Sequence, residues 1–461
     1  MESKVIKNLF CSEYLWDYLK DLKTVGVLKR DKEKKVIEIG VPKGIVASII
    51  PTTNPTSTAL FKSIISIKGR NTTVISPHPR AKKCIQRAAQ IMHQAAVDAG
   101  APEGCIGCLS YPTLEATHEL MKHKYTSVIL ATGGSGLVKA AYSSGKPALG
   151  VGPGNAPAYI DPSADILHAV SAILMSQTFD WGTICSTEQS IVAHRIVAPR
   201  VLKELARQKA YICSPEEIRL LEKGIVGSAG HGLNAEIVGK SPVFIANLCG
   251  FQVPEDTTAL VAPYSGIGRG YPLSMEKLSP ILAFYECDSL EDGMDKCRRL
   301  LEYGGTGHTL AIHAQDEDVI LEMSMALPAY RIVINSPTVQ GAIGYATNLV
   351  PSMSLGCGAP GNNIIAQNIN ALDLIDIKRV AWVKEGFVKP LVSQEDGQSF
   401  LSRESYVHSS HGTGASVSQT SPIQDVALSR PKSPKESLSP LSEKEIESIL
   451  KKANLKNKDG Y

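Results

Sequence analysis

Long apolar stretches and a strong charge of either sign are both absent from this chain of 461 residues. No run of about eighteen consecutive apolar residues occurs, which excludes a typical membrane-spanning helix. Residues 1–7 are charged and no long apolar core follows them, so we expect no secretory signal and a cytoplasmic protein. The net charge is +3, with basic residues dispersed among acidic ones, and we therefore expect no nucleic-acid partner.

Patterns that hold metal ions are scarce as well. The chain has ten cysteines, of which only Cys105 and Cys108 form a C-x-x-C pair. Neither a second such pair nor a histidine pair at zinc spacing accompanies it, so we expect no metal or redox centre there. Because no secretion signal is expected, we interpret the scattered cysteines as reduced thiols and not as a disulfide framework.

Short apolar runs alternate with amphipathic segments from Gly44 onward, which is typical of a parallel sheet covered by helices on both faces. The first set has expected strands at 45–50, 72–76, 106–110 and 127–131, and expected helices at 56–68, 80–99 and 113–123. A second set has expected strands at 191–197, 259–262, 281–285, 309–313 and 332–334. Alternating residues at 24–39 around a polar centre predict a β-hairpin before both sets. The sequence therefore predicts an α/β protein with two domains.

Two of the expected strand ends carry residues suited to ligands, which gather at the carboxyl ends of parallel strands. The turn 131–136 reads Ala-Thr-Gly-Gly-Ser-Gly and opens a helix, so its backbone amides could face a phosphate group. It lacks the GxGxxG spacing of dinucleotide-binding proteins. After the strand 45–50, Asn54 stands between two prolines; it is either part of a helix N-terminal turn or a rigid amide donor for an oxyanion.

The stretch 179–190, Phe-Asp-Trp-Gly-Thr-Ile-Cys-Ser-Thr-Glu-Gln-Ser, places Cys185 shortly after a glycine turn and before an apolar strand. Small neighbours and a supported turn let a carbonyl carbon approach the sulfur, as a nucleophilic cysteine requires. A buried structural cysteine is the alternative. Because Cys185 would lie at the seam between the two α/β sets, where ligand clefts form, we expect it to be a nucleophile.

Together these stretches resemble the aldehyde dehydrogenase superfamily, specifically its coenzyme A-acylating branch. The resemblance covers residues 4–382 and is to the aldehyde dehydrogenase half of bifunctional aldehyde–alcohol dehydrogenases and to acylating enzymes of bacterial microcompartments. Its most specific segments are 51–58 (Pro-Thr-Thr-Asn-Pro-Thr-Ser-Thr), 133–135, 150–157, 179–190 and 276–280 (Glu-Lys-Leu-Ser-Pro).

The resemblance implies an aldehyde dehydrogenase fold with three parts. A Rossmann-like NAD-binding domain is implied at 1–184 and an α/β catalytic domain at 185–345. A small β oligomerisation element is implied for the hairpin at 24–39 together with a return segment at 346–385, which would build a homodimer or homotetramer. Members of the family have a further helical stretch before the position that matches Met1.

The resemblance also implies a role for each matching residue. Cys185 would add to the aldehyde carbonyl as a thiohemiacetal, while the Asn54 amide and the backbone N–H of Cys185 hold the oxyanion. Hydride transfer to NAD would then leave a thioester on Cys185. Cofactor contacts are implied for Thr132, Gly133 and Gly134 beside the phosphates, for Ser76, Pro77 and His78 beside the adenosine ribose, and for Glu276 at the nicotinamide ribose. Taken alone, Glu276 would instead be interpreted as a solvated charge on a helix.

Val151 stands where hydrolytic members carry the glutamate that activates water. Valine cannot accept a proton, whereas a thiol such as coenzyme A can attack the thioester without that base. The resemblance therefore implies reversible conversion of a short aldehyde, acetaldehyde or propionaldehyde, to its acyl-coenzyme A. The alternatives are a hydrolytic dehydrogenase that releases a carboxylate, and an inactive cargo or scaffold protein of a microcompartment. Trp181 stands where acylating relatives usually have Asn, which implies a narrower or differently shaped pocket.

After Trp382 the composition of the chain changes. Residues 393–440 are rich in Ser, Pro, Gly and Gln, which predicts a disordered linker. Residues 441–456 predict a short amphipathic helix whose apolar face needs a partner surface. This segment resembles the encapsulation peptides of microcompartment enzymes, so a shell protein is the expected partner and the interior of a microcompartment a possible location. Folding back onto the enzyme is the alternative.

Overall fold

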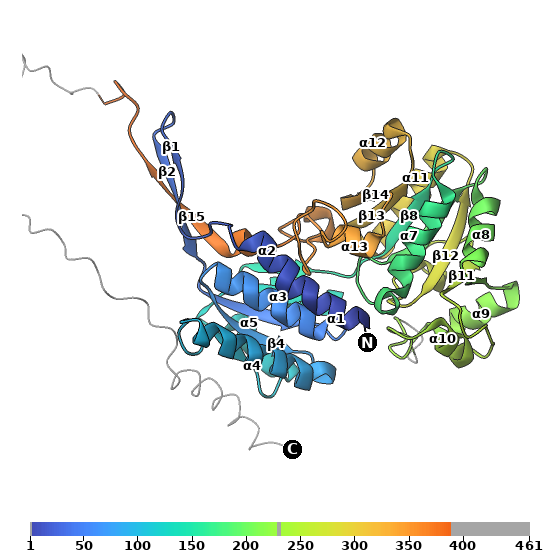
Figure 1. Ribbon diagram of the computed structural model, residues 1–461, viewed down its shortest axis with the longest axis horizontal. Coiled ribbons are helices and arrows are strands. Elements are labelled where there is room, and N and C mark those ends of the chain that lie inside the picture. Colours follow the sequence, from blue (N-terminus) through green and yellow to red (C-terminus); the bar gives the residue numbers. More distant parts are fainter. Residues whose placement is uncertain (1, 228–231, 389–461) are drawn as a thin grey trace, which may run out of the picture.

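The computed structural model describes residues 2–227 and 232–388. It contains two parallel sheets, each in its own α/β domain, and a small antiparallel sheet (Figure 1). The α/β class expected from the alternating pattern is confirmed. Within the described part, no helix has both the length and the apolar character needed to cross a bilayer. The predicted linker at 393–440 and the predicted helix at 441–456 lie outside the described residues.

The first domain is built on a five-stranded parallel sheet with the order β5-β4-β3-β6-β7. Its elements are β3 (Ile45–Ile50), α3 (Pro55–Lys68), β4 (Thr72–Pro77), α4 (Lys82–Asp98), β5 (Ile106–Cys108), α5 (Leu114–Lys122), β6 (Thr126–Thr132), α6 (Ser135–Tyr142) and β7 (Ala148–Val151). The central strand β3 is apolar on both faces because helices cover both: Ile50 packs in a cluster with Ile85 of α4, and Ile49 in a cluster with Met121 of α5.

The second domain is built on a seven-stranded parallel sheet with the order β10-β11-β12-β9-β8-β13-β14. Its strands are β8 (Ala156–Ile160), β9 (Glu188–His194), β10 (Ala210–Ile212), β11 (Ala259–Pro263), β12 (Ile281–Cys287), β13 (Gly307–His313) and β14 (Ala329–Ile334). Its helices are α7 (Ile166–Thr178), α8 (Ala198–Arg207), α9 (Pro215–Gly224), α10 (Pro242–Cys249), α11 (Leu290–Gly304), α12 (Glu317–Ala326) and α13 (Thr338–Ala342).

The chain passes from the first parallel sheet to the second at residues 152–155. The expected boundary between 184 and 185 is therefore placed too late, because β8 already pairs with β9 and β13 of the second sheet and α7 packs against that sheet. The strand expected at 191–197 is shifted as well: β9 begins at Glu188 and ends at His194. Its first three residues are polar but buried, so an apolar run could not reveal where the strand starts.

An N-terminal helix that the sequence analysis did not predict lies against α3 (Figure 1). It consists of α1 (Glu2–Leu9), the π-helical turn η1 (Phe10–Tyr14) and α2 (Leu15–Leu19). Phe10 and Leu15 are buried in a cluster that includes Phe61 of α3 and also Val339 of α13 in the second domain. Because this cluster contains residues of both domains, it packs the two domains against each other.

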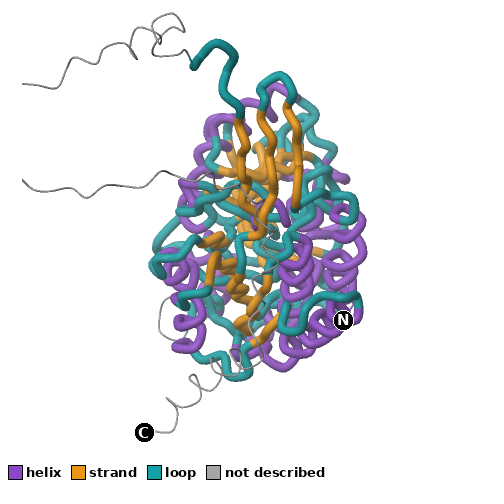
Figure 2. Tube along the Cα trace, turned by 90° about the vertical axis from the view of Figure 1, so that its left-hand side faces the viewer, coloured by secondary structure: helices purple, strands orange, loops and turns teal. Residues whose placement is uncertain are grey.

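The third sheet is antiparallel, with the order β1-β2-β15. The hairpin expected at 24–39 is confirmed as β1 (Gly26–Asp31) and β2 (Val36–Pro42), and β15 (Ile375–Ala381) adds along β2. Figure 2 shows the three strands side by side at one end of the molecule. Because β15 lies next to β2, the chain returns to its first domain after completing the second. The oligomerisation role expected for this sheet stays a prediction.

Candidate active site

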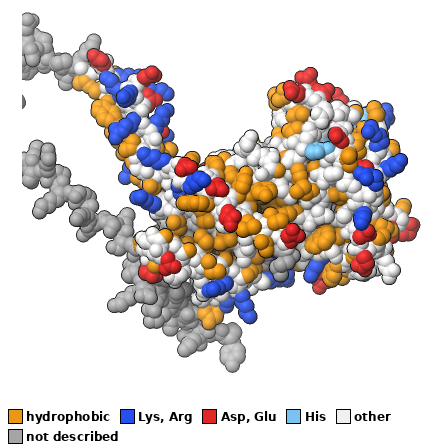
Figure 3. Space-filling model, viewed as in Figure 1, with side chains coloured by type: hydrophobic (Ala, Val, Ile, Leu, Met, Phe, Trp, Pro, Cys, Tyr) orange, Lys and Arg blue, Asp and Glu red, His pale blue; other side chains and the backbone are white. Residues whose placement is uncertain are grey.

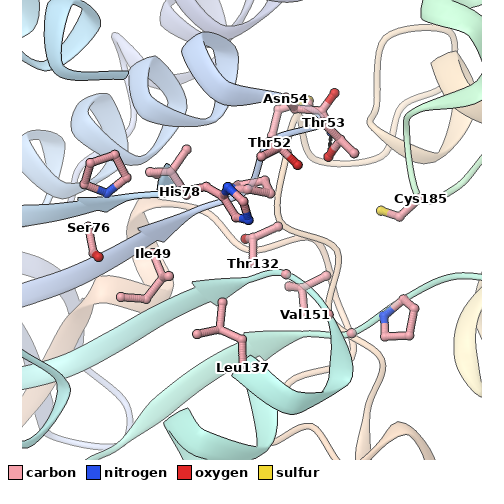
Figure 4. A pocket seen from close by; sticks show the side chains of 18 of the residues that line it. Ile49, Thr52, Thr53, Asn54, Ser76, His78, Thr132, Leu137, Val151 and Cys185 are labelled. Atoms are coloured by element: carbon pink, nitrogen blue, oxygen red, sulfur yellow. Dashed lines mark hydrogen bonds between the residues drawn. The ribbon is translucent and has the colours of Figure 1, made fainter. Parts of the chain in front are cut away.

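A cavity of about 470 Å³ lies where the carboxyl ends of β3, β4 and β6 face the second domain. This volume is within the usual range for a small-molecule site. All nine residues singled out from the sequence line it, and they come from both domains: Asn54, Ser76, Pro77, His78, Thr132, Gly133, Gly134, Cys185 and Glu276. Figure 4 labels Asn54, Ser76, His78, Thr132 and Cys185 among them. The seam expected between the two α/β sets is therefore where these residues meet.

Cys185 lies in the loop between the short helical segment η3 (Phe179–Gly182) and β9, with its sulfur directed toward the cavity (Figure 4). The loop is shaped by three consecutive residues in the left-handed region: Asp180 (φ 52°), Trp181 (φ 50°) and Gly182 (φ 71°). At Gly182 a side chain would also meet the backbone of Ser279, with the nearest atom at 3.1 Å. Only glycine satisfies both constraints there.

The backbone of Cys185 is packed against Gly154 from the segment that joins the two parallel sheets. A Cβ atom added to Gly154 would lie 2.0 Å from the carbonyl oxygen of Cys185. Gly154 therefore lets the connecting segment pass directly behind Cys185. This close approach is one physical reason why residues 150–157 are rich in glycine.

The thiol of Cys185 is protonated at neutral pH, because its pKa is raised to about 12. Desolvation is the largest cause, although the side chain is only half-buried and keeps contact with the cavity. Glu276 and Cys357 raise the pKa further, and Arg331 opposes them. A nucleophilic role for this cysteine thus requires an additional positive charge or a base when substrates are bound.

Asn54 follows β3 and stands directly before the first residue of α3, 8% exposed. Asn54 thus occupies the N-cap position of a helix N-terminal turn, as one of the two alternatives from the sequence has it, but its side chain makes no capping hydrogen bond. The Oδ1 atom instead accepts a hydrogen bond of 2.7 Å from the Nζ of Lys7 in α1. One N–H of Nδ2 is directed to Thr53 Oγ1 at 3.2 Å. Sequence reasoning missed Lys7, because α1 has no local pattern that points to a site 47 residues away.

The turn after β6 offers room and donors for a phosphate group. Thr132, the last residue of β6, is followed by Gly133 and by Gly134, which stands directly before α6. Among the described residues no side chain caps α6 there, and a Cβ atom on Gly134 or Gly136 would meet nothing within 4 Å. Uncapped amides at a helix N-terminus suit an anion, so the arrangement fits the pyrophosphate of a dinucleotide.

The end of β4 lines the opposite side of the cavity from Cys185 (Figure 4). Ser76 is buried and shares a hydrogen bond of 2.8 Å with Thr117, so its hydroxyl is already partnered within the protein. His78 is exposed, and burial of part of its ring together with Arg80 lowers its pKa. It is therefore neutral near pH 7 and adds no positive charge to this side.

Glu276 lies between two elements of the second domain, outside any helix, so the alternative of a solvated helix charge is wrong. Its Oε1 accepts a hydrogen bond of 2.9 Å from the backbone N–H of Gly154. Burial raises the pKa of Glu276 to about 8, with Gly154 and Lys277 acting in the opposite direction. This carboxyl therefore lines the cavity and is held by Gly154 of the connecting segment, which also packs behind Cys185.

Two further residues define what the cavity can do. Val151 ends β7 beside Thr132, is 2% exposed and lines the cavity without any ionisable group. Trp181 is not among the residues that line the cavity, so its side chain does not itself narrow the pocket as the resemblance implied. No group of three His, Cys, Asp or Glu side chains in the described ranges is arranged to hold a metal ion.

Comparison with known proteins places these features in context. Residues 3–213 match the family model for the aldehyde dehydrogenase family. The bifunctional aldehyde-alcohol dehydrogenase of Escherichia coli (strain K12) is 46% identical over 386 residues, which are 83% of this chain and 43% of that protein. The chain thus spans less than half the length of the aldehyde-alcohol dehydrogenases it matches.

Solved structures resemble the chain over most of their length. An acetylating aldehyde dehydrogenase from Geobacillus thermoglucosidasius is 52% identical with a TM-score of 0.82, over 84% of this chain and 85% of that one. A propionaldehyde dehydrogenase from Rhodopseudomonas palustris, with bound coenzyme A and an acylated cysteine, is 26% identical with a TM-score of 0.75, over 83% and 84% of the two chains.

Proposed function

This chain belongs to the aldehyde dehydrogenase family, and on that premise we propose that it is a coenzyme A-acylating aldehyde dehydrogenase. It oxidises a short aldehyde with NAD and passes the acyl group through Cys185 to coenzyme A, in a reversible reaction. The observation that carries the proposal is the convergence of Cys185, Asn54 and the non-ionisable Val151 on one cavity. The acetylating relative from Geobacillus supports the same acyl acceptor.

The chemistry begins with the sulfur of Cys185 attacking the aldehyde carbon. When bound, NAD supplies the hydride acceptor and a positively charged ring, and a positive charge beside the sulfur favours the thiolate over the protonated thiol. The carbonyl oxygen becomes an oxyanion, which accepts hydrogen bonds from Asn54 Nδ2 and the backbone N–H of Cys185. Loss of hydride from the carbon then converts the thiohemiacetal to a thioester.

The second half of the reaction transfers the acyl group. The coenzyme A thiolate attacks the thioester carbonyl, the same two donors hold the second oxyanion, and the Cys185 thiolate leaves. Water would need a base for the corresponding attack. Val151 cannot provide one, and this absence favours the thiol as acyl acceptor.

NAD is favoured over NADP by the electrostatics of the cavity. Its lining contains no lysine or arginine within the described residues, and the one histidine, His78, has a lowered pKa. A 2′-phosphate would therefore lack a cationic partner on the side of the cavity formed by β4. The amides at the start of α6, together with Thr132, Gly133 and Gly134, would hold the pyrophosphate.

The substrate is a short aliphatic aldehyde, acetaldehyde or propionaldehyde. Four apolar side chains line the cavity on the side of the second domain and of the chain that follows it: Leu278, Ile343, Met353 and Leu355. The lining that the described residues form has no lysine or arginine to pair with a carboxylate or sulfonate on the substrate. An apolar acyl chain is thus the chemistry that this lining accepts.

The proposal extends to the assembly, location and partners of the chain. The chain forms a homodimer or homotetramer through the three-stranded sheet, where β15 is an exposed edge strand. Ile377 and Val380 of β15 and Trp382 just after it are exposed. Figure 3 shows apolar and basic side chains together on the projecting part of the molecule at upper left, which this sheet forms. The enzyme acts in the cytoplasm, and residues 441–456 attach it to a microcompartment shell protein.

The test is NADH formation by the full chain with an aldehyde, measured with and without coenzyme A. We expect NADH and acyl-coenzyme A together, no turnover with C185A, and an acyl adduct on Cys185 in protein quenched during the reaction. Equal NADH rates without coenzyme A, with carboxylate as product, would establish the hydrolytic dehydrogenase instead. A folded protein that shows no turnover with a panel of short aldehydes would favour the scaffold role.

A further inference from the structure

We propose that Lys7 is a positioning residue that orients the Asn54 amide toward the reacting carbonyl, and that Asp180 couples this lysine to the nucleophile loop. The inference rests on the proposed function, in which Asn54 holds the oxyanion. It assigns a role to the N-terminal helix, which otherwise contributes only packing. Its observation is a continuous set of hydrogen bonds from α1 through Asn54 and Asp180 to the segment that carries Cys185.

Lys7 is buried far more deeply than lysine side chains usually are, so its burial needs a specific explanation. Its side chain is 1% exposed, although α1 lies on the outside of the first domain. The ammonium group donates to Asn54 Oδ1 at 2.7 Å and also forms an ion pair with Asp180. Desolvation lowers the pKa of Lys7 to about 8, and Asp180 limits that decrease.

The chemistry of lysine decides which way the Asn54 amide faces. An ammonium group has hydrogen-bond donors and no acceptor, so only the amide oxygen can point at it. The amide nitrogen is then turned away from Lys7. One of its N–H groups meets Thr53 Oγ1, which leaves the other for an oxyanion in the cavity. A cation on Oδ1 also polarises the amide and strengthens Nδ2 as a donor.

Asp180 extends this arrangement to the nucleophile. The same carboxylate oxygen that pairs with Lys7 accepts a hydrogen bond of 2.7 Å from the Thr183 hydroxyl, two residues before Cys185. Asp180 and Trp181 both have positive φ, a costly conformation for residues with side chains. The strained backbone keeps the carboxylate directed at α1. The Asn54 amide, through Lys7, and the segment that carries the Cys185 N–H, through Thr183, are therefore both connected to Asp180.

Lys4 provides a matched control from the same helix. It pairs with the same Asp180 oxygen at 2.7 Å and donates to the Thr53 carbonyl at 2.9 Å, but it has no bond to Asn54 and is 41% exposed. A purely structural role in fastening α1 would be shared by Lys4 and Lys7. An orienting role belongs to Lys7 alone.

The experiment is steady-state kinetics of NADH formation with aldehyde and coenzyme A for the full chain and for K7M, K4M, N54A and the double variant K7M/N54A. Removal of one oxyanion donor typically lowers kcat about 10²- to 10³-fold. We expect about a 10- to 100-fold lower kcat for K7M with little change in KM, and less than about a 3-fold change for K4M. K7M/N54A should be no slower than N54A, because Lys7 acts through Asn54.

Two controls separate the possible failures. Alkylation of Cys185 by iodoacetamide should proceed at the wild-type rate in K7M, which shows that the loop is intact. If K7M does not fold, K7Q is compared with N54A in the same way. Multiplying losses in the double variant, or equal losses in K7M and K4M, would overturn the role of Lys7. Absence of coenzyme A-dependent turnover in the wild-type protein would overturn the proposed function itself.

Discussion

Replacing Val151 with glutamate should divert part of the turnover from thiol transfer to hydrolysis. Val151 is 2% exposed, ends β7 beside Thr132 and lines the same cavity as Cys185. A carboxylate at this position could accept a proton from a water molecule that attacks the thioester. The matched control is V151Q, because its amide has nearly the shape of the carboxyl group and cannot act as a base.

The size of the effect depends on how much of the introduced carboxyl group is ionised. The same cavity raises the pKa of Glu276 to about 8, chiefly by burial. A similar pKa for the introduced group would leave about one tenth of it ionised at pH 7. General base catalysis contributes about 10²- to 10⁴-fold, so hydrolysis should increase about 10- to 1,000-fold and rise further as the pH passes 8.

The assay is release of carboxylate with NADH in the absence of coenzyme A, measured between about pH 6 and pH 9. V151E should show a rate that increases with pH, whereas the wild-type protein and V151Q should stay slow. Thermal melting of both variants monitors the cost of placing a polar group in the lining. Equal carboxylate rates for V151E and V151Q across the range would refute the idea that this position decides the acyl acceptor.

Two further predictions concern stability. G154A should lose about 1–3 kcal/mol of unfolding free energy in denaturant, because its Cβ would lie 2.0 Å from the Cys185 carbonyl oxygen; G134A, where a Cβ meets nothing within 4 Å, should change little, and equal losses would contradict this reasoning. The pKa of Glu276 is about 8 in the folded chain but has its ordinary value of 4.5 when the chain is unfolded, so stability should fall as pH rises from 4.5 through 8. E276Q should show a smaller fall, and parallel curves for the two proteins would refute the assignment.

Much of the site could be predicted because its residues follow strand ends or stand at a marked turn. Asn54 follows an apolar run that can only be a buried strand, and Thr132 follows another. Cys185 stands just after a turn that contains Gly182. Parallel strands bring their carboxyl ends to one edge, so residues distant in the chain meet there without any knowledge of side-chain contacts.

The parts that sequence reasoning missed depend on contacts between distant segments. Lys7 belongs to an amphipathic helix like many others, and only the docking of α1 on α3 brings it to Asn54. The domain boundary was placed too late because β8 reads as a strand in either domain, and hydrogen bonding to β9 and β13 decides its sheet. Glu276 carries no local sign that the backbone of Gly154 will meet its carboxylate.

The pairing of β15 with β2 has a consequence for how the chain is made on the ribosome. Strand β2 ends at Pro42, but its partner spans Ile375–Ala381, so more than 300 residues must be synthesised before that edge is covered. The core beneath α3 likewise waits for Ile369 and Leu374. Translation therefore leaves an open strand edge on the nascent polypeptide for most of its synthesis. Expression of this chain should accordingly depend most on chaperones during that interval.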